Sequence, residues 1–371
     1  MTKYIHELPN WAKFHWDQHS LAKQLAIVRH RQGRLIGRMQ ELGFPLQEEA
    51  VLQTLTEDVR KSSEIEGEIL DKEQVRSSIA RRLGMDKAGL PSADRNVEGV
   101  VEMMLDATQK YKEELTRDRL FSWHASLFPT GRSGMKKIIV GAWRDEKSAP
   151  MQVVSGPYGR ERVHYEAPPT GRLDIEIEAF LDWFNGEDDS DLVLKAALAH
   201  LWFVTIHPFE DGNGRIARAI ADMSLARSEA STQRFYSMSA QIRIERVAYY
   251  EILESTQKGD LDITPWMEWF LGCLDRAFDG AERTLSRVFT KADFWKKHST
   301  APLNERQRDI INRLLDGFEG KLTSSKWAAI EKCSPDTALR DISDLVERGM
   351  MVKDAGGGRS TSYSLVDEAE S

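Results

Sequence analysis

Apolar residues recur at spacings of three and four positions through most of the chain, and this pattern predicts a mainly α-helical protein. The first such segment has Asp17 before it as a cap and Gly43-Phe44-Pro45 after it as a stop. A nearly continuous apolar run at residues 194–206 predicts a buried helix. The predicted helices occupy residues 18–42, 46–65, 71–83, 96–111, 120–127, 173–184, 194–206, 215–227, 242–258 and 264–297.

One stretch in the middle of the chain breaks the helical pattern. Residues 138–144 lack helical spacing, and residues 152–154 and 162–166 are strand-like segments on either side of a turn rich in glycine. Pro168 and Pro169 close the second segment. This pattern predicts a β-hairpin.

The C-terminal region changes character from about residue 303. Segments 305–315, 324–330 and 335–348 have helical patterns, and two strand-like segments, 350–353 and 361–365, flank a glycine turn at 356–358. Three helices followed by a two-stranded wing resemble a winged helix domain, which commonly places its third helix in the major groove of DNA. That helix carries Asp336, Asp341, Asp344 and Glu347 against Arg340 and Arg348. The balance is poor for phosphate contact, so packing or protein interaction stays an alternative to DNA binding.

Composition narrows the class of protein. With 371 residues, 41% hydrophobic and 30% charged, the chain is long enough for two or three domains with a sizeable core. The net charge of −8 argues against a general nucleic-acid or membrane binder. The N-terminus lacks an apolar segment of signal-peptide length, and no run approaches the ~18 apolar residues of a membrane span. Because Cys273 and Cys333 are the only cysteines, we expect a cytoplasmic protein without a disulfide framework.

The densest chemistry lies between residues 207 and 218, where the sequence reads His-Pro-Phe-Glu-Asp-Gly-Asn-Gly-Arg-Ile-Ala-Arg. Pro208 disfavours helical geometry at His207, so the preceding helix should end there. Gly212 and Gly214 allow a tight turn before a new helix begins at Arg215. A turn that leads into a helix N-terminus presents free N–H groups and the positive end of the helix dipole, which together bind anions.

Three kinds of side chain in this stretch suit phosphate chemistry. Arg215 and Arg218 lie in the first turn of the helix, where a cation is unfavourable unless an anion binds. Asp211 is a hard oxygen ligand of the kind that holds Mg2+ beside phosphates. His207 is a candidate base because the ordinary histidine pKa is near neutrality. A surface turn after a core histidine is the plain alternative, but the convergence of these groups favours a functional site.

The stretch matches His-x-Phe-x-Asp/Glu-Gly-Asn-Gly-Arg-x-x-Arg at every defined position and resembles the core motif of the Fic family. The resemblance implies a helical bundle with a β-hairpin flap, and an enzyme that transfers AMP from ATP to a Ser, Thr or Tyr hydroxyl of a target protein. It implies His207 as the base, Asp211 as the residue that holds Mg2+, and Phe209 as an apolar anchor. The ATP- and phosphate-binding residues that it implies, with the Asn213 side chain among the contacting groups, are Gly212, Asn213, Gly214, Arg215, Ile216, Ala217 and Arg218.

An upstream segment resembles the inhibitory motif of the same family, Ser/Thr-x-x-x-Glu-Gly/Asn, with Ser62, Glu66 and Gly67 at its defined positions. The spacing puts Ser62 and Glu66 one turn apart on one helix face. The resemblance implies that Glu66 pairs with Arg218 and fills the place of the ATP γ-phosphate. A solvated helix end, with Gly67 as its stop, is the alternative interpretation.

The predicted hairpin corresponds to the flap of the family, which the resemblance places beside the ATP site and which aligns a target segment by strand pairing. The flap residues that it implies nearest the nucleotide are Val163, His164, Tyr165 and Glu166. The residues that it implies on the adenine side are Tyr249, Tyr250 and Gln257. Core packing is an equally good account of the two tyrosines, because both fall within a predicted helix.

These features predict an N-terminal helical domain with the inhibitory helix at residues 1–92, a Fic catalytic domain at 93–298 and a winged helix-like domain at 299–371. We expect an ATP-dependent adenylyltransferase restrained by Glu66, with a protein target that can be the enzyme itself, and a homodimer as in related family members. Removal of AMP by the same site, and a nucleotide-sensing regulator that binds DNA, stay as alternatives. Transfer of phosphate or other nucleotide pieces fits less well, because relatives with those activities have altered core motifs.

Overall fold

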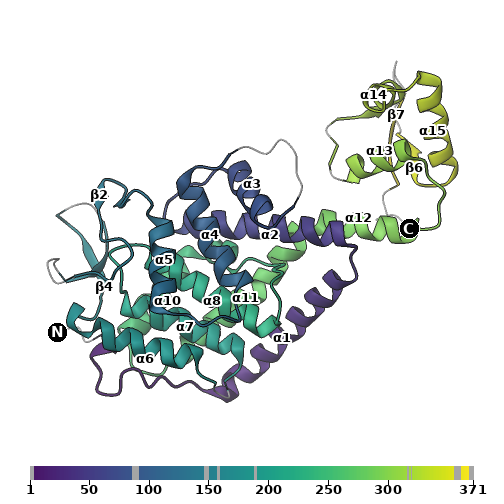
Figure 1. Cartoon of the computed structure of the whole chain (residues 1–371). Helices are drawn as coiled ribbons and strands as arrows, with labels where there is room; N and C mark the ends of the chain where they lie inside the picture. The colour runs from purple at the N-terminus through teal and green to yellow at the C-terminus, as the bar shows by residue number, and fades with distance from the viewer. Residues whose placement is uncertain are drawn as a thin grey trace. The chain divides into compact units, whose positions relative to one another are not determined.

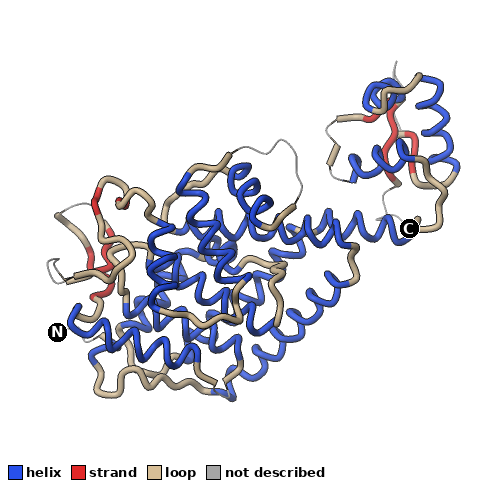
Figure 2. Tube along the Cα trace, viewed as in Figure 1, coloured by secondary structure: helices blue, strands red, loops and turns tan. Residues whose placement is uncertain are grey.

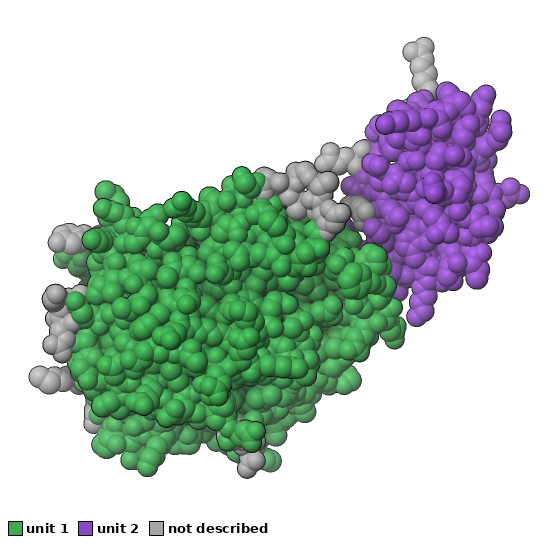
Figure 3. Space-filling view, viewed as in Figure 1, with its two compact units in different colours: residues 1–284 green, residues 285–371 purple. Residues whose placement is uncertain are grey.

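The computed structural model describes residues 4–85, 92–145, 150–156, 159–187, 190–315, 317–318, 320–354 and 361–366. The chain divides into two compact units, residues 1–284 and 285–371 (Figure 3). Both units are mainly helical with short strands, as the apolar pattern predicts (Figures 1 and 2). The finer division into three domains stays a prediction. Within the described ranges, no helix is long and apolar enough to cross a membrane.

The first unit is a bundle of helices. They are α1 (Gln18–Gln40), α2 (Phe44–Ile65), α3 (Lys72–Arg82), α4 (Arg95–Gln109), α5 (Arg117–Leu127), α6 (Leu173–Asn185), α7 (Leu192–Ile206), α8 (Asn213–Glu229), α9 (Met238–Ile244), α10 (Arg246–Gln257) and α11 (Thr264–Thr284), with single 3-10 turns at η1 (Ile5–Glu7) and η2 (Thr170–Arg172). Six of these helices begin after a side chain that accepts hydrogen bonds from their first N–H groups, which sets their start. The capping residues are Asp17, Asp71, Asp94, Thr116, Asp191 and Ser237.

Two predicted helices are interrupted. The prediction of one helix over residues 242–258 is wrong, because the chain leaves helical geometry at Glu245, where ψ is 24°. The Glu245 carboxylate accepts a hydrogen bond from Arg276 of α11 at 2.6 Å, a contact between distant segments that a local pattern does not reveal. The helix predicted over residues 264–297 is likewise divided at Leu285, the first residue of the second unit.

Helix α7 lies at the centre of the first unit (Figure 1). Each of its residues from 193 to 206 is buried, as expected for a helix that is apolar on all sides. It packs along α8, and Phe180 of α6 contacts the rings of Trp202 and Phe203 on α7. Trp266 of α11 donates a hydrogen bond to the carbonyl of Ala197 at 2.8 Å. This packing fixes the end of α7 beside the start of α8. The loop that joins them, residues 207–212, is called the motif loop below.

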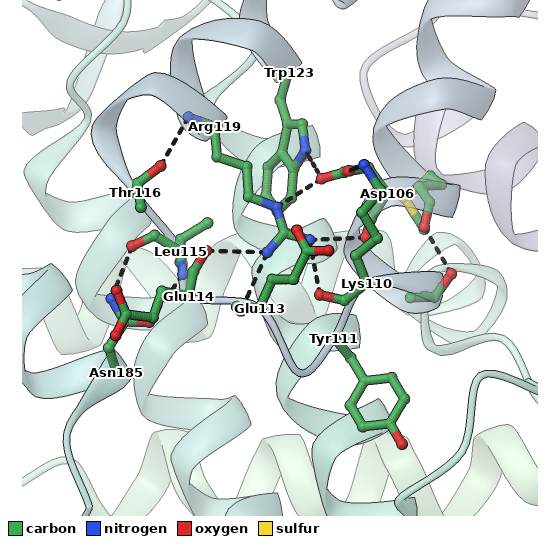
Figure 4. Close-up of polar contacts among 12 residues, drawn as sticks. Asp106, Lys110, Tyr111, Glu113, Glu114, Leu115, Thr116, Arg119, Trp123 and Asn185 are labelled. Atoms are coloured by element: carbon green, nitrogen blue, oxygen red, sulfur yellow. Dashed lines mark hydrogen bonds and ion pairs between the residues drawn. The ribbon is translucent and has the colours of Figure 1, made fainter.

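A polar network holds α5 against α4 (Figure 4). Arg119 Nε donates to Asp106 Oδ2 at 2.6 Å, and Trp123 Nε1 donates to the same oxygen at 2.7 Å. The two helices also approach closely at Gly99, where a Cβ would collide with the carbonyl of Ser126. These contacts position α5, whose C-terminal end lies under the motif loop.

The predicted β-hairpin is present as β3 (Gln152–Ser155) and β4 (Arg162–Glu166), which pair in antiparallel orientation. Gln152 lies opposite Glu166, and the register shifts between Val153 and Val154. The N-terminal segment braces the base of this hairpin, because His6 Nε2 donates to the Glu166 carbonyl at 2.9 Å. A second hairpin, β1 (Arg132–Ser133) and β2 (Lys136–Lys137), escaped prediction because each strand has only two residues.

The second unit contains α12 (Ser286–Lys297), α13 (Glu305–Leu315), β5 (Leu322–Thr323), α14 (Ser324–Ile330), α15 (Pro335–Glu347), β6 (Met351–Lys353) and β7 (Ser362–Leu365). Its three strands form an antiparallel sheet in the order β5-β7-β6. Trp327, Ile342 and Leu345 are fully buried in its core. The three helices and two strands predicted after residue 303 are present, β5 is additional, and the predicted turn at 356–358 lies outside the described residues.

Candidate active site

The C-terminus of α7 delivers His207 in an unusual backbone conformation. His207 has φ 51° and ψ 57°, the left-handed region, and its N–H donates to the Phe203 carbonyl at 3.1 Å. A residue with a Cβ adopts this conformation at a cost, so other contacts must hold it. Arg144 supplies them, with Nε donating to the His207 carbonyl at 2.8 Å and its backbone N–H donating to the Pro208 carbonyl at 3.0 Å.

The His207 imidazole is oriented as an acceptor. Its Nδ1 lies 3.1 Å from the Val204 carbonyl, which can only accept, so the hydrogen bond assigns the proton to Nδ1 and leaves a lone pair on Nε2. Burial lowers the His207 pKa to about 4, and the charge of Arg144 acts in the same direction. The ring is therefore neutral at pH 7, the state that a base requires.

The motif loop is braced from within by two residues. Phe209 is fully buried, and its ring stacks on His124 with centroids 4.1 Å apart and planes 6° apart. The Asn213 side chain accepts from the Phe209 N–H at 3.0 Å and donates to the Phe209 carbonyl at 2.8 Å. The anchor role expected for Phe209 agrees with this packing. The Asn213 side chain braces the loop through both ends of its amide. One N–H and one oxygen lone pair of that amide are not used by these two bonds, so the phosphate contact that the resemblance implied stays a prediction.

Asp211 is oriented by three neighbours. Its Oδ1 accepts from the Gly212 N–H at 2.6 Å, and its Oδ2 accepts from the Ser133 hydroxyl. Its backbone carbonyl accepts from His124 Nε2 at 3.2 Å, while His124 Nδ1 accepts from the Gly141 N–H at 3.1 Å. Burial lowers the pKa of His124 to about 4, so the ring that holds the Asp211 carbonyl is uncharged at pH 7. Sequence reasoning missed both His124 and Ser133, because neither lies in a recognisable motif.

Helix α8 begins two residues earlier than predicted, at Asn213. Helix geometry leaves the N–H groups of Asn213, Gly214 and Arg215 without partners inside the helix. The Ile216 N–H donates to the Gly212 carbonyl at 3.0 Å, and the side chains of Ile216 and Ala217 are fully buried. The donors available to an anion are therefore at 213–215, and Ile216 and Ala217 belong to the core, in place of the ATP contact that the resemblance implied.

The inhibitory segment contacts the same helix. Arg218 is buried, and its Nη2 lies 2.9 Å from Glu66 Oε1. Its Nε donates to the Ser62 hydroxyl at 3.0 Å, and Nη2 also donates to the Ser62 carbonyl at 2.8 Å. A Cβ at Gly214 would collide with the Glu66 carboxylate, and Gly67 has φ 88° as α2 ends. Ser62, Glu66 and Arg218 are thus together, as the spacing and the motif predicted.

The flap residues divide into two groups. Val163 is exposed, and His164 Nδ1 lies 2.6 Å from Glu254 Oε2 on α10, which ties the flap to that helix. Tyr165 is 1% exposed and donates to the Thr205 carbonyl at 2.7 Å. Glu166 lies at the base of the hairpin and accepts from Gln152 at 2.8 Å. Tyr165 is therefore a core residue, in place of the nucleotide contact that was expected.

The residues expected on the adenine side also divide. Tyr249 is 1% exposed and its hydroxyl lies 2.9 Å from His200 Nε2, whereas Gln257 is buried and donates to Thr205 at 3.2 Å. Tyr250 is 36% exposed. Of these three residues, Tyr250 presents the accessible ring, while Tyr249 and Gln257 pack in the core. The alternative interpretation of core packing therefore describes Tyr249.

Comparison with known proteins gives two matched regions. Residues 114–225 match the Fic/DOC family, and residues 4–85 match a domain of unknown function, DUF4172. The chain is 33% identical over 132 residues to a protein of Drosophila willistoni, and 32% identical over 132 residues to one of Drosophila melanogaster, both named protein adenylyltransferase Fic. Each alignment covers 34% of this chain and 25% of the relative, so the chain spans about a quarter of the length of these relatives.

The fold is similar to two crystal structures. One is a Fic family protein from Desulfovibrio desulfuricans, with TM-score 0.58 and 22% identity over 96% of this chain and 99% of that chain. The other is a Fic domain-containing signaling protein from Bacteroides thetaiotaomicron, with TM-score 0.51 and 21% identity over 71% of this chain and 97% of that chain. At these identities the likeness concerns the fold.

Proposed function

We propose, on the match of residues 114–225 to the Fic/DOC family, that this protein transfers AMP from ATP to a hydroxyl side chain of a target protein. The observation that carries the proposal is the neutral His207 imidazole beside the N-terminus of α8, where free N–H groups and two arginines offer an anion site. The relatives named protein adenylyltransferase support ATP as the nucleotide.

In the proposed reaction, His207 Nε2 takes the proton of the target hydroxyl, and the hydroxyl oxygen forms a bond to the α-phosphorus of ATP. The bond from that phosphorus to its bridging oxygen breaks, and pyrophosphate leaves. The N–H groups at 213–215 and the Arg215 side chain bind the phosphate oxygens, while Arg218 binds the γ-phosphate. The negative charge of the bound phosphates raises the His207 pKa from about 4 toward neutrality, which strengthens the base.

Mg2+ fits this site at Asp211. Each carboxylate oxygen accepts one hydrogen bond, from Gly212 or from Ser133, and keeps a lone pair for a hard cation. Across the part of the chain that the structure describes, no group of three His, Cys, Asp or Glu side chains could hold a metal. Mg2+ commonly binds through one carboxylate, substrate phosphates and water, which suits a lone Asp211. Bound Mg2+ neutralises phosphate charge, and Asp211 would orient it.

We further propose that the structure represents a restrained state. The Glu66 carboxylate is 31% exposed and pairs with the buried guanidinium of Arg218, which the γ-phosphate would otherwise occupy. Ser62 adds two hydrogen bonds to the same guanidinium, so the segment satisfies Arg218 without a nucleotide. When Glu66 moves away, the Arg218 guanidinium becomes available to bind the γ-phosphate.

On the nucleoside side, Tyr250 is our candidate for stacking on adenine. Its ring is partly exposed, with the Arg246 guanidinium 5.2 Å from its centroid and the Tyr249 ring 5.1 Å away. Tyr249 supports this ring from the core. The exposed Val163 on the flap is our candidate for contact with the target segment, and the target can be a second copy of the chain, since we expect a homodimer.

For the second unit we propose a winged helix that contacts protein. Its order of helices and strands, with the sheet order β5-β7-β6, supports the resemblance. Asp341 on α15 pairs with Arg306 at 2.8 Å, and Asp344 pairs with Arg348 at 2.9 Å. The second pair engages Arg348, one of the two arginines that residues 335–348 offer for phosphate contacts, which weighs against DNA as the partner.

The test compares wild type, Glu66→Gly and His207→Ala incubated with Mg2+ and ATP labelled on the α-phosphate, with a cell lysate as the target source. We expect strong protein labelling with Glu66→Gly, weaker labelling with wild type and none with His207→Ala. Label from the γ-phosphate in place of the α-phosphate would replace the proposal with phosphorylation. If neither label appears on any protein, AMP removal or nucleotide sensing takes the place of transfer.

A further inference from the structure

A second carboxylate of the inhibitory segment, that of Glu68, contacts the first arginine of the motif helix, Arg215. Glu68 Oε2 lies 2.7 Å from Arg215 Nη1. The Arg215 side chain is 3% exposed, whereas the Glu68 side chain is 49% exposed. Glu68 therefore reaches from solvent onto a buried cation, in the same way that Glu66 reaches Arg218.

Arg215 has little else to neutralise it. Its guanidinium lies 5.1 Å from the Phe128 ring centroid, and its Nε has no hydrogen-bond partner among the described residues. A buried cation at a helix N-terminus is opposed by burial and by the helix dipole, so it requires an anion. Without a bound phosphate, Glu68 is the anion in contact with Arg215.

The turn after α2 explains how one short segment reaches both arginines. The Glu68 N–H donates to the Ser63 carbonyl at 3.0 Å across Gly67, whose positive φ reverses the chain. Arg246 Nε donates to the Ile65 carbonyl at 2.8 Å and pins the end of the helix to α10. The turn thus presents Glu66 and Glu68, on either side of Gly67, to two arginines one helical turn apart.

We infer that Glu68 is a second inhibitory carboxylate, and that Glu66 and Glu68 together occupy the positions in which two phosphate groups of the nucleotide would bind. This inference rests on the proposed function, in which Arg218 binds the γ-phosphate and Arg215 binds a phosphate nearer the nucleoside. Glu66 then competes only with a triphosphate, because a diphosphate has no γ-phosphate to bind Arg218 in the place of Glu66. Glu68 competes with ATP and ADP alike.

This difference gives a binding test that needs no transfer chemistry. In a His207→Ala background, calorimetric titration with ATP and with ADP in the presence of Mg2+ is compared for Glu66→Gln, Glu68→Gln and the parent. We expect Glu68→Gln to tighten both nucleotides about fivefold, the scale of one partly exposed ion pair. We expect Glu66→Gln to tighten ATP and leave ADP unchanged.

Glu64→Gln is the matched control. Glu64 lies on the same helix end, but it pairs with Lys61 at 2.6 Å and Arg243 at 3.4 Å and contacts neither motif arginine. Its substitution should leave both affinities unchanged. Unchanged ATP and ADP affinities in Glu68→Gln, with tighter ATP binding in Glu66→Gln, would overturn the role of Glu68 and leave the proposed function standing. Failure of every variant to bind either nucleotide would overturn the proposed function and the inference with it.

Discussion

Protonation of His124 should loosen the motif loop as the pH falls below neutrality. This ring is fully buried, donates through Nε2 to the Asp211 carbonyl and accepts through Nδ1 from the Gly141 N–H. Burial lowers its pKa from 6.5 to about 4. Since Nδ1 must give up its acceptor role when it gains a proton, the folded state resists protonation and the unfolded chain does not.

These two pKa values decide whether a lower pH stabilises or destabilises the folded state. Below pH 6.5 the unfolded state binds a proton that the folded state refuses, so the stability from neutral His124 is complete above pH 6.5 and is lost as the pH falls toward 4. Each pH unit within this window costs about 1.4 kcal/mol. The free energy of unfolding should therefore fall by about 2 kcal/mol between pH 6.5 and pH 5 through this residue alone.

His124→Gln isolates this contribution, because glutamine does not titrate while His207 and His200, whose pKa values are also lowered by burial, stay in place. Urea unfolding of wild type and variant, followed by tryptophan fluorescence at pH 7, 6 and 5, measures it. The difference in the free energy of unfolding between wild type and His124→Gln should be about 2 kcal/mol smaller at pH 5 than at pH 7. His19→Gln, at an exposed histidine, should follow wild type. Parallel pH profiles for wild type and His124→Gln would refute the reasoning.

Three further predictions concern the loop and the nucleoside side. Phe209→Ala should lower the free energy of unfolding by about 3–5 kcal/mol, because it removes a fully buried ring, and a loss below ~1 kcal/mol in urea unfolding would contradict the anchor role. Asn213→Ala should cost about 2 kcal/mol in the same assay through two lost hydrogen bonds, and an unchanged stability would show that the side chain does not brace the loop. Tyr250→Ala should raise the KM for ATP with little change in thermal midpoint, whereas Tyr249→Ala should lower the midpoint, and the reverse pattern would exchange their roles.

Local structure followed closely from the sequence where its causes are local. The helix predicted over residues 46–65 is found at Phe44–Ile65, and the helix predicted over 305–315 is found at Glu305–Leu315. Apolar spacing and capping side chains suffice for such elements, because their hydrogen bonds join near neighbours. The strand β5 was missed because two residues carry too little periodicity to detect.

The identity of the chemical groups was also readable from the sequence. The motif placed a histidine, an acid, a glycine turn and two arginines at one helix start, and Glu66 one turn from Ser62. The structural role of each of these residues was harder to predict. Asn213 braces the loop, and Tyr165 and Tyr249 lie in the core, because burial depends on which segments pack around a residue.

What the sequence determined by itself is therefore the position of most helices, the β3-β4 hairpin and the stock of phosphate-binding groups. The tertiary structure decided which groups meet. The pairs Ser62–Arg218 and Glu68–Arg215 join residues 156 and 147 positions apart, and His124 reaches Asp211 across 87. Periodicity reports only neighbours within a few residues, whereas contacts of this range exist only after α2, α5 and α8 have packed together.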